Sequence, residues 1–177
     1  MDVIRTHPNT QVMLDAWRRL AQGGEIADGP DIDEHPGLVA SLFVLNHCGE
    51  RDFAFRRAGA TLDRLFGRPL ADHNFLSIWF ETDRRLVAAG LSVALKDRGP
   101  LLIHARGETL AGKRIDLEFA LAPLEIPEGA LPRFLGLCQT ITPEDVLNSR
   151  PLRALQALAI FPPAPSPSPA IRIVSSR

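Results

Sequence analysis

Residues 52–79, DFAFRRAGATLDRLFGRPLADHNFLSIW, constrain the fold of this chain more than any other stretch. Phe53 and Phe55 alternate with smaller or polar residues, which is the pattern of a β-strand. Gly59 ends that strand, and Gly67 ends a short helix with its apolar residues on one face. A strand and helix separated by glycines predict short helices folded over one face of a sheet, an arrangement that can enclose a ligand.

Apolar patterns elsewhere in the chain extend this sheet. Residues 41–46 are a continuous apolar run, typical of a buried strand, and their short link to residues 53–58 predicts an antiparallel hairpin. Three more strands are expected over residues 100–107, 113–124 and 132–141. The last of these is apolar on both faces, so we expect it to be central.

The strand over residues 113–124 alternates between apolar and charged side chains. Its apolar positions predict one face turned to the core, and we expect Asp116 and Glu118 to lie on a solvated face. Helices are expected over residues 10–22, 82–98 and 147–158, because apolar residues recur there at spacings of three and four.

Composition limits the class of protein. The net charge of −1 and the 45% of hydrophobic residues describe an ordinary globular domain, and they indicate neither nucleic acid binding nor attraction to anionic membranes. The chain has no apolar run near the ~20 residues that a membrane helix needs, and its first residues do not form a signal peptide. We therefore expect a cytoplasmic protein without membrane insertion.

No pattern in the sequence indicates catalysis, a metal or a cofactor. No two of the five histidines stand at metal-ligand spacing, and no nucleophile elbow, phosphate loop or dinucleotide-binding glycine set is present. Cys48 and Cys138 both neighbour apolar residues, so we expect buried, unreactive thiols.

Four arginines in the opening segment form a candidate phosphate or anion site. Arg56, Arg57, Arg64 and Arg68 could gather beside the short helix, and guanidinium groups suit phosphate geometry. The alternative is that these side chains face solvent or pair with nearby carboxylates.

Several segments resemble one family. AWRRL (16–20), DIDEHP (31–36), FRRAGATLDRLFGRPL (55–70), FLSIW (75–79) and FLGLCQTITP (134–143) are similar to a PAS-like family of alphaproteobacteria, formerly classed as a domain of unknown function. The order of elements is also that of the PAS fold, an α+β fold with a five-stranded antiparallel sheet and helices across one face.

This resemblance implies a division of the chain. Residues 1–24 would be an N-terminal amphipathic helix for capping or dimerisation, and residues 25–143 the PAS-like sensor domain. A C-terminal helix would lie within residues 144–161, followed by a flexible Pro-rich tail over residues 162–177.

The resemblance also implies a ligand cavity between the inner sheet face and the helices of residues 61–95. The same apolar side chains would serve equally well as plain core residues. The candidate cavity residues are Phe55, Leu65, Phe66, Phe75, Trp79, Leu91, Phe119 and Leu137.

By this resemblance the protein is a stand-alone, non-enzymatic sensor or adaptor of bacterial signal transduction, binding a small molecule, a partner protein or both. Output would pass to an unidentified signalling partner or to a second copy, with homodimerisation through Met13, Trp17 and Leu20. The same helix could instead cap its own sheet. The alternatives for function are an interaction module with a filled core, or a small isomerase-like α+β enzyme with a buried acid facing the cavity.

Overall fold

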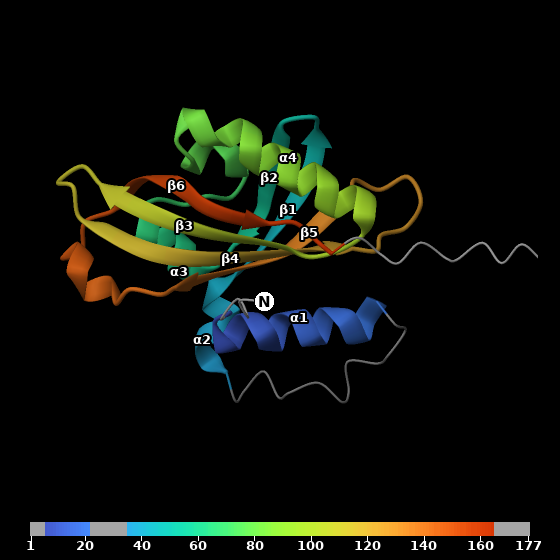
Figure 1. Ribbon diagram of the computed structural model, residues 1–177, viewed down its shortest axis with the longest axis horizontal. Helices are drawn as coiled ribbons and strands as arrows, with labels where there is room; N and C mark the ends of the chain where they lie inside the picture. The colour runs from blue at the N-terminus through green and yellow to red at the C-terminus, as the bar shows by residue number, and fades with distance from the viewer. Residues whose placement is uncertain (1–5, 22–34, 165–177) are drawn as a thin grey trace, which may run out of the picture.

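The computed structural model describes residues 6–21 and 35–164, which form an antiparallel sheet between two layers of helices (Figure 1). The strand order in the sheet is β2-β1-β5-β4-β3-β6. The strands are β1 (Leu42–Gly49), β2 (Asp52–Ala58), β3 (Leu101–Thr109), β4 (Arg114–Leu124), β5 (Arg133–Thr140) and β6 (Leu152–Phe161). The helices are α1 (Pro8–Ala21), α2 (Pro36–Ser41), α3 (Ala60–Phe66), η3 (Phe75–Ile78), α4 (Glu81–Asp97) and η4 (Glu144–Leu147).

The two faces of the sheet carry different layers. The inner face packs against α3, η3 and α4, and the outer face packs against α1 and α2. Alternation along β4 separates the two, because Phe119 belongs to the inner cluster and Ala120 to the outer one. The predicted α+β fold is therefore confirmed, with β5 in the interior of the sheet as expected.

One segment, residues 72–83, hydrogen-bonds the free edges of both outermost strands. Next to β2, the Phe55 amide donates to the His73 carbonyl at 2.9 Å, and the Asp72 amide donates to the Phe55 carbonyl at 2.8 Å. At β6, the Phe80 amide donates to the Leu155 carbonyl at 2.8 Å. Because one short segment reaches both edges, the sheet must curl around the inner layer, and neither edge is left fully open for pairing.

The helix predicted over residues 147–158 is wrong, since residues 152–158 lie in β6, which adds a sixth strand to the expected five. Two irregularities in the pairing with β3 leave Arg153 and Leu158 without a partner residue. These bulges reset the alternation, so the fully buried side chains are Leu152 and Leu155, three residues apart. That spacing imitates a helix, whereas the backbone hydrogen bonds along the edge of β3 favour a strand.

The remaining element predictions hold within a few residues at each end. The N-terminal helix and the long helix are α1 and α4, and the β1–β2 hairpin is antiparallel. The Pro-rich tail beyond residue 164 and the acidic stretch over residues 22–34 lie outside the described residues. No helix in the described part of the chain is both long enough and apolar enough to cross a membrane.

Gly136 allows the closest approach in the inner layer. It lies opposite Phe43 in the β1–β5 register, and a Cβ atom at position 136 would collide with the Phe43 ring. That ring is held between Phe55, Phe75 and Phe119, with centroid distances of 5.7, 5.8 and 6.2 Å. Since the ring is fixed on its other sides, glycine is required where β5 passes beneath it.

The two cysteines differ, although the sequence predicts two buried thiols. Cys138 on β5 is fully buried in the inner cluster, whereas Cys48 is exposed near the β1–β2 turn. Burial, and to a lesser extent the negative charge of Glu144, raise the pKa of the Cys138 thiol. Its neutral form is therefore favoured, and the prediction for Cys48 is wrong because a hairpin end is solvated.

We expect Gly136→Ala to destabilise the protein by about 1–3 kcal/mol, because the added methyl group displaces the Phe43 ring. Gly37→Ala in α2 is the matched control, since a Cβ there meets nothing within 4 Å. The control should match or slightly exceed the wild-type melting temperature, because alanine favours a helix. Thermal unfolding followed by circular dichroism measures both, and equal stability of Gly136→Ala and wild type would contradict this packing.

We expect one fast-reacting thiol in the native protein and two after denaturation. The measurement is titration with dithiobis(nitrobenzoate), which reacts with accessible thiolates. Cys48→Ser should remove the fast phase and leave the slow one. Two fast equivalents in the native protein would show that Cys138 is accessible after all.

Candidate functional site

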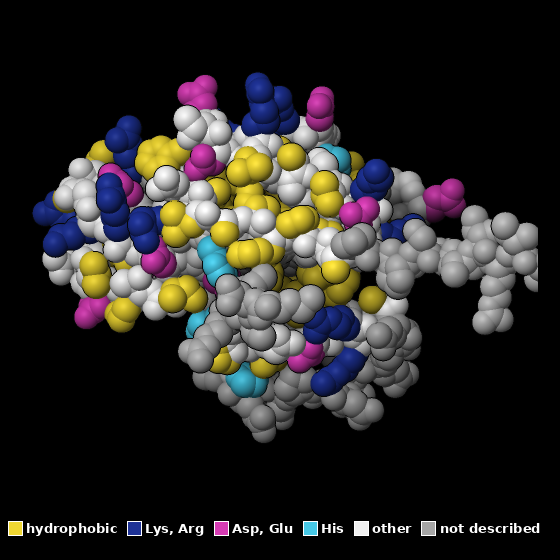
Figure 2. All heavy atoms as spheres, viewed as in Figure 1, with side chains coloured by type: hydrophobic (Ala, Val, Ile, Leu, Met, Phe, Trp, Pro, Cys, Tyr) yellow, Lys and Arg dark blue, Asp and Glu magenta, His cyan; other side chains and the backbone are white. Residues whose placement is uncertain are grey.

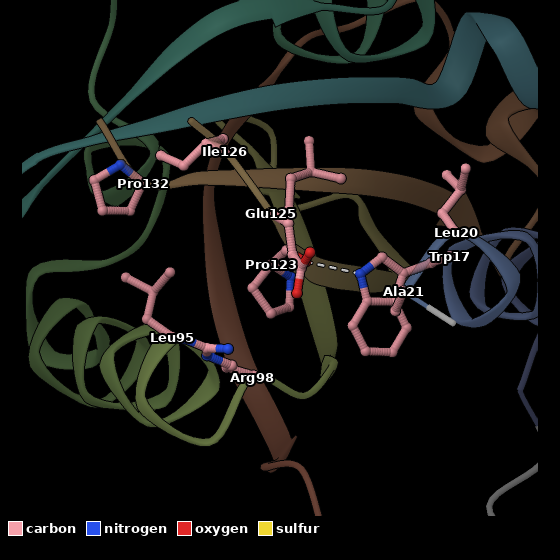
Figure 3. Close-up of a pocket in the computed structure, with 10 residues that line it drawn as sticks. Trp17, Leu20, Ala21, Leu95, Arg98, Pro123, Glu125, Ile126 and Pro132 are labelled. Atoms are coloured by element: carbon pink, nitrogen blue, oxygen red, sulfur yellow. Dashed lines mark hydrogen bonds between the residues drawn. The ribbon is translucent and has the colours of Figure 1, made fainter. Parts of the chain in front are cut away.

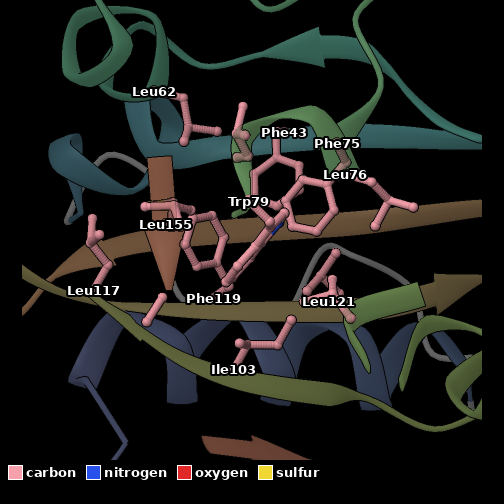
Figure 4. Packing of buried hydrophobic residues seen from close by; sticks show 14 of the residues in the cluster. Phe43, Leu62, Phe75, Leu76, Trp79, Ile103, Leu117, Phe119, Leu121 and Leu155 are labelled. Carbon is pink, nitrogen blue, oxygen red and sulfur yellow. The ribbon is translucent and has the colours of Figure 1, made fainter. Parts of the chain in front are cut away.

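Seven of the eight predicted cavity residues lie together in the inner layer. They come from β2, α3, η3, the position directly after η3, α4 and β4. All belong to one buried cluster, part of which is drawn in Figure 4. The seven are Phe55, Leu65, Phe66, Phe75, Trp79, Leu91 and Phe119. Their shared location agrees with the prediction that these residues face one another, although the same contacts describe a packed core.

Aromatic rings occupy the centre of this layer. Trp79 contacts Phe75 and Phe119, with centroid distances of 5.7 and 5.5 Å, and Phe75 contacts Phe119 at 5.9 Å (Figure 4). Such edge-on and tilted contacts stabilise aromatic clusters beyond simple burial. The inner layer is therefore dense at the position where a cavity was expected.

Trp79 carries a polar group that this dense layer does not satisfy. Its side chain is buried, and its indole Nε1 has no hydrogen-bond acceptor among the residues that the structure describes. Buried polar groups in proteins are nearly always paired, so an unpaired N–H needs an explanation. The Trp79 backbone is held, since its carbonyl accepts a hydrogen bond from Arg84 Nε at 3.1 Å.

Leu137 and Glu118 lie on the outer face, and the predictions for both residues are wrong. Leu137 belongs to the cluster under α1, because it is one residue away from the inward-facing Cys138 on β5. Glu118 was expected on a solvated face, yet it is 1% exposed. The side chains of β4 alternate as predicted, but α1 covers the outer face at this point, which no local pattern in β4 reveals.

The four arginines do not act as one group in the described structure. The Arg64 guanidinium binds the Glu144 carboxylate through contacts of 3.0 to 3.3 Å. Arg64 therefore pairs with a carboxylate, as the alternative hypothesis predicts. Arg56, Arg57 and Arg68 are exposed, the first two at adjacent positions of β2. Lys and Arg side chains are interspersed with Asp and Glu on the visible face (Figure 2). An anion site at these arginines stays a prediction.

The predicted dimerisation residues belong to a helix that caps its own sheet. Met13 is 3% exposed in the outer cluster, so it is not available to a second copy in this structure. Trp17 is half-buried, and its indole N–H donates to the Pro123 carbonyl at 2.7 Å. Leu20, at the end of α1, is 42% exposed. Of the three side chains, Leu20 has the largest exposed fraction.

A groove of about 610 Å³ lies where the ends of α1 and α4 approach the β4–β5 connection (Figure 3). Its walls are mainly apolar, and Arg98 and Glu125 supply its charged groups. Its residues are Trp17, Leu20, Ala21, Leu95, Arg98, Pro123, Leu124, Glu125, Ile126 and Pro132. The sequence does not reveal this groove because its walls come from elements far apart in the chain.

Within the described ranges, no cluster of three or more His, Cys, Asp or Glu side chains has the arrangement of a metal site. The polar groups that sequence reasoning missed are the indole N–H of Trp79 and the carboxylate of Glu118. Trp79 is predicted from the sequence as an apolar cavity residue and Glu118 as a solvated one, and only the packing of other elements shows that both polar groups are buried.

A family model described as "PAS domain" matches residues 5–139 of this chain. That match includes α1, the inner helices and β1 through most of β5. No curated protein matches the chain.

Solved structures with a similar arrangement include light-oxygen-voltage proteins. The Rhodobacter sphaeroides LOV protein is 16% identical with a TM-score of 0.47, over 61% of this chain and 62% of its own. The dark structure of Aureochrome1 LOV is 14% identical with a TM-score of 0.48, over 69% of this chain and 92% of its own.

A PAS domain from Colwellia psychrerythraea is 12% identical with a TM-score of 0.47, over 64% of this chain and 98% of its own. These similarities are too low to carry an argument about ligand or partner. The family match spans most of the chain, and together with the strand order it leads to one conclusion. The chain belongs to the PAS domain family.

Proposed function

We propose that this protein is a sensory or adaptor module of signal transduction in the bacterial cytoplasm. It binds a small molecule in its inner layer, a partner protein, or both, and binding shifts the population of its conformations. Family membership over residues 5–139 supports the sensory role. The fold alone does not identify a ligand, because one fold serves many functions.

The observation that carries the ligand part of the proposal is the unpaired indole N–H of Trp79. An unsatisfied buried donor costs about 1–3 kcal/mol, and a ligand atom with a lone pair would recover that free energy. The surrounding Phe75 and Phe119 rings favour a ligand with a flat, apolar body. We therefore propose a small aromatic or hydrophobic molecule with one acceptor oxygen or nitrogen directed at Trp79.

A second candidate function is an interaction module whose inner layer is simply a filled core. The contacts among Phe43, Phe75, Trp79 and Phe119 favour it, because rings at van der Waals distance already pack the centre of the layer. In that case the signal would be the partner protein itself.

The isomerase-like alternative requires a buried acid or base that faces the inner layer. Of the buried polar and charged residues that the structure describes, Glu118 is the only acid, and its carboxylate lies on the opposite face of the sheet, where it accepts a hydrogen bond from the His7 amide. This geometry favours the signalling function over acid–base chemistry in the inner layer.

We expect a compound that raises the melting temperature of the wild type to lose affinity for Trp79→Phe. Loss of one buried hydrogen bond is worth about 0.5–1.5 kcal/mol, roughly two- to tenfold in affinity. Trp17→Phe is the matched control, since it removes the other tryptophan from the outer side of the sheet and should leave the ligand-induced shift unchanged.

The compounds to test are any molecule found by native mass spectrometry of freshly purified protein, together with a panel of nucleotides and hydrophobic metabolites. Stabilisation by a nucleotide that Arg68→Ala abolishes would support the anion site. No bound molecule and no stabilisation by any compound would contradict the ligand proposal and favour the filled-core module.

We further propose that the protein forms a homodimer through the exposed end of α1, and Leu20→Asp should then lower the dimer fraction. The measurement is light scattering against the monomer mass of 19.4 kDa. Leu110→Asp is the control, because Leu110 is 85% exposed at the β3–β4 turn, far from α1 in the chain. A wild-type monomer at all concentrations, or an unchanged dimer in Leu20→Asp, would contradict this interface.

A further inference from the structure

The groove between the ends of α1 and α4 and the β4–β5 connection presents apolar surface to the outside of the molecule. Its apolar wall includes Trp17, Leu95 and Ile126, all of which are half-buried. Its volume of about 610 Å³ falls in the range of binding pockets. Partly exposed apolar surface gathered in one groove is typical of a binding site, because single surface apolar residues are usually scattered.

The described chain ends at the rim of this groove. β6 stops at Phe161, and Pro163 then packs so closely against Gly99 that a Cβ atom at position 99 would collide with the proline ring. Gly99 directly follows Arg98, which lines the groove. Figure 1 shows β6 ending on the same side of the molecule as α1, α4 and the β4–β5 connection. The described residues therefore stop beside the groove, with residues 165–177 still to follow.

The sequence of residues 165–177 suits such a groove. Its first part, PSPSP, predicts an extended spacer that covers about 3.1 Å per residue, so Ile171 lies within roughly 20 Å of Ala164. That reach is similar to the length of α1, whose 14 residues rise by about 1.5 Å each. Ile171 and Ile173 stand at alternate positions, so an extended backbone would turn both side chains to one side and Arg172 to the other.

The charges of the two partners are complementary in this orientation. Residues 165–177 contain two arginines and no acidic residue. Glu125 is exposed on the groove, where it can pair with Arg172. Arg98 lies beside the point where the uncharged Pro–Ser spacer enters, so it is not forced against Arg172. An exposed ion pair adds little affinity, but it favours one register of the segment over others.

We propose that this groove binds the chain's own C-terminal segment, with Ile171 and Ile173 packed against the apolar wall. The covalent link gives the segment a high effective concentration, so a small apolar contact is enough to hold it. Binding would connect the end of β6 to α1 and to the β4–β5 connection. The ligand proposal for the inner layer is independent of this one, because Trp79 and the rings around it do not line the groove.

The first test changes the segment in the full chain, and hydrogen–deuterium exchange of the amides of residues 171–174 is the measurement. In the wild type we expect exchange roughly tenfold or more slower than in an unstructured peptide of the same sequence, since apolar side chains are buried. Ile171→Asp combined with Ile173→Asp should abolish this protection. Ser175→Asp combined with Ser176→Asp is the control, because it adds the same charge nearby and leaves the isoleucines in place.

The second test changes the groove. Ile126→Asp should free the amides of residues 171–174, whereas Leu131→Asp should not. Both residues belong to the β4–β5 connection, but Leu131 is 48% exposed and does not line the groove. Unchanged protection of β4 and β5 shows that each variant is folded. If Ile126→Asp disturbs the strands, the first test decides, since its substitutions lie outside the described fold.

Protection of residues 171–174 that is independent of concentration and lost only in the Ile126→Asp and double-isoleucine variants supports the proposal. Exchange at the unprotected rate in the wild type would overturn it. So would equal protection in a folded variant and its control, because the segment would then bind elsewhere. Protection that disappears on dilution would also overturn it and assign the groove to the segment of a second copy.

Discussion

The hydrogen bonds of residues 72–83 to both edges of the sheet set the curl of the sheet and the position of the inner layer. The Phe55 amide is bound on the β2 side and the Leu155 carbonyl on the β6 side, so strands at opposite ends of the sheet order are tied to one segment. The same segment contains η3, whose first turn is capped by the Asn74 side chain. Curling of the sheet and placement of Phe75 and Trp79 in the inner layer therefore have one common cause.

The two faces of β4 contact different layers of the structure. Along β4, Phe119 faces the aromatic layer, while its neighbour Glu118 faces α1. Successive side chains of a strand point to opposite faces, so these consecutive residues serve different layers of the structure. The unpaired Trp79 N–H and the hydrogen-bonded carboxylate of Glu118 therefore lie on opposite sides of the sheet.

Much of this fold could be predicted from local patterns. Glycine breaks, apolar alternation and helical spacing located α1, α4 and five of the strands, whereas the family resemblance grouped Phe55, Phe75 and Phe119 in one layer. Prediction failed where a distant element decided the environment. Bulges in the pairing with β3 gave β6 a helix-like spacing, and α1 buried Glu118 on a face that seemed solvated. The exposure of Cys48 likewise depends on where the hairpin ends, not on its neighbours in sequence.

The order of elements from α1 to β5, the two faces of β4 and the family resemblance follow from the amino-acid sequence alone, and the match over residues 5–139 bears out the resemblance. These features depend on short-range periodicity and on glycine positions, which act within a few residues. The position of Leu137 under α1, the pairing of Arg64 with Glu144 and the burial of the polar groups of Trp79 and Glu118 depend instead on tertiary contacts. Burial and pairing are properties of segments far apart in the chain, so they appear only once the sheet has curled and α1 has covered it.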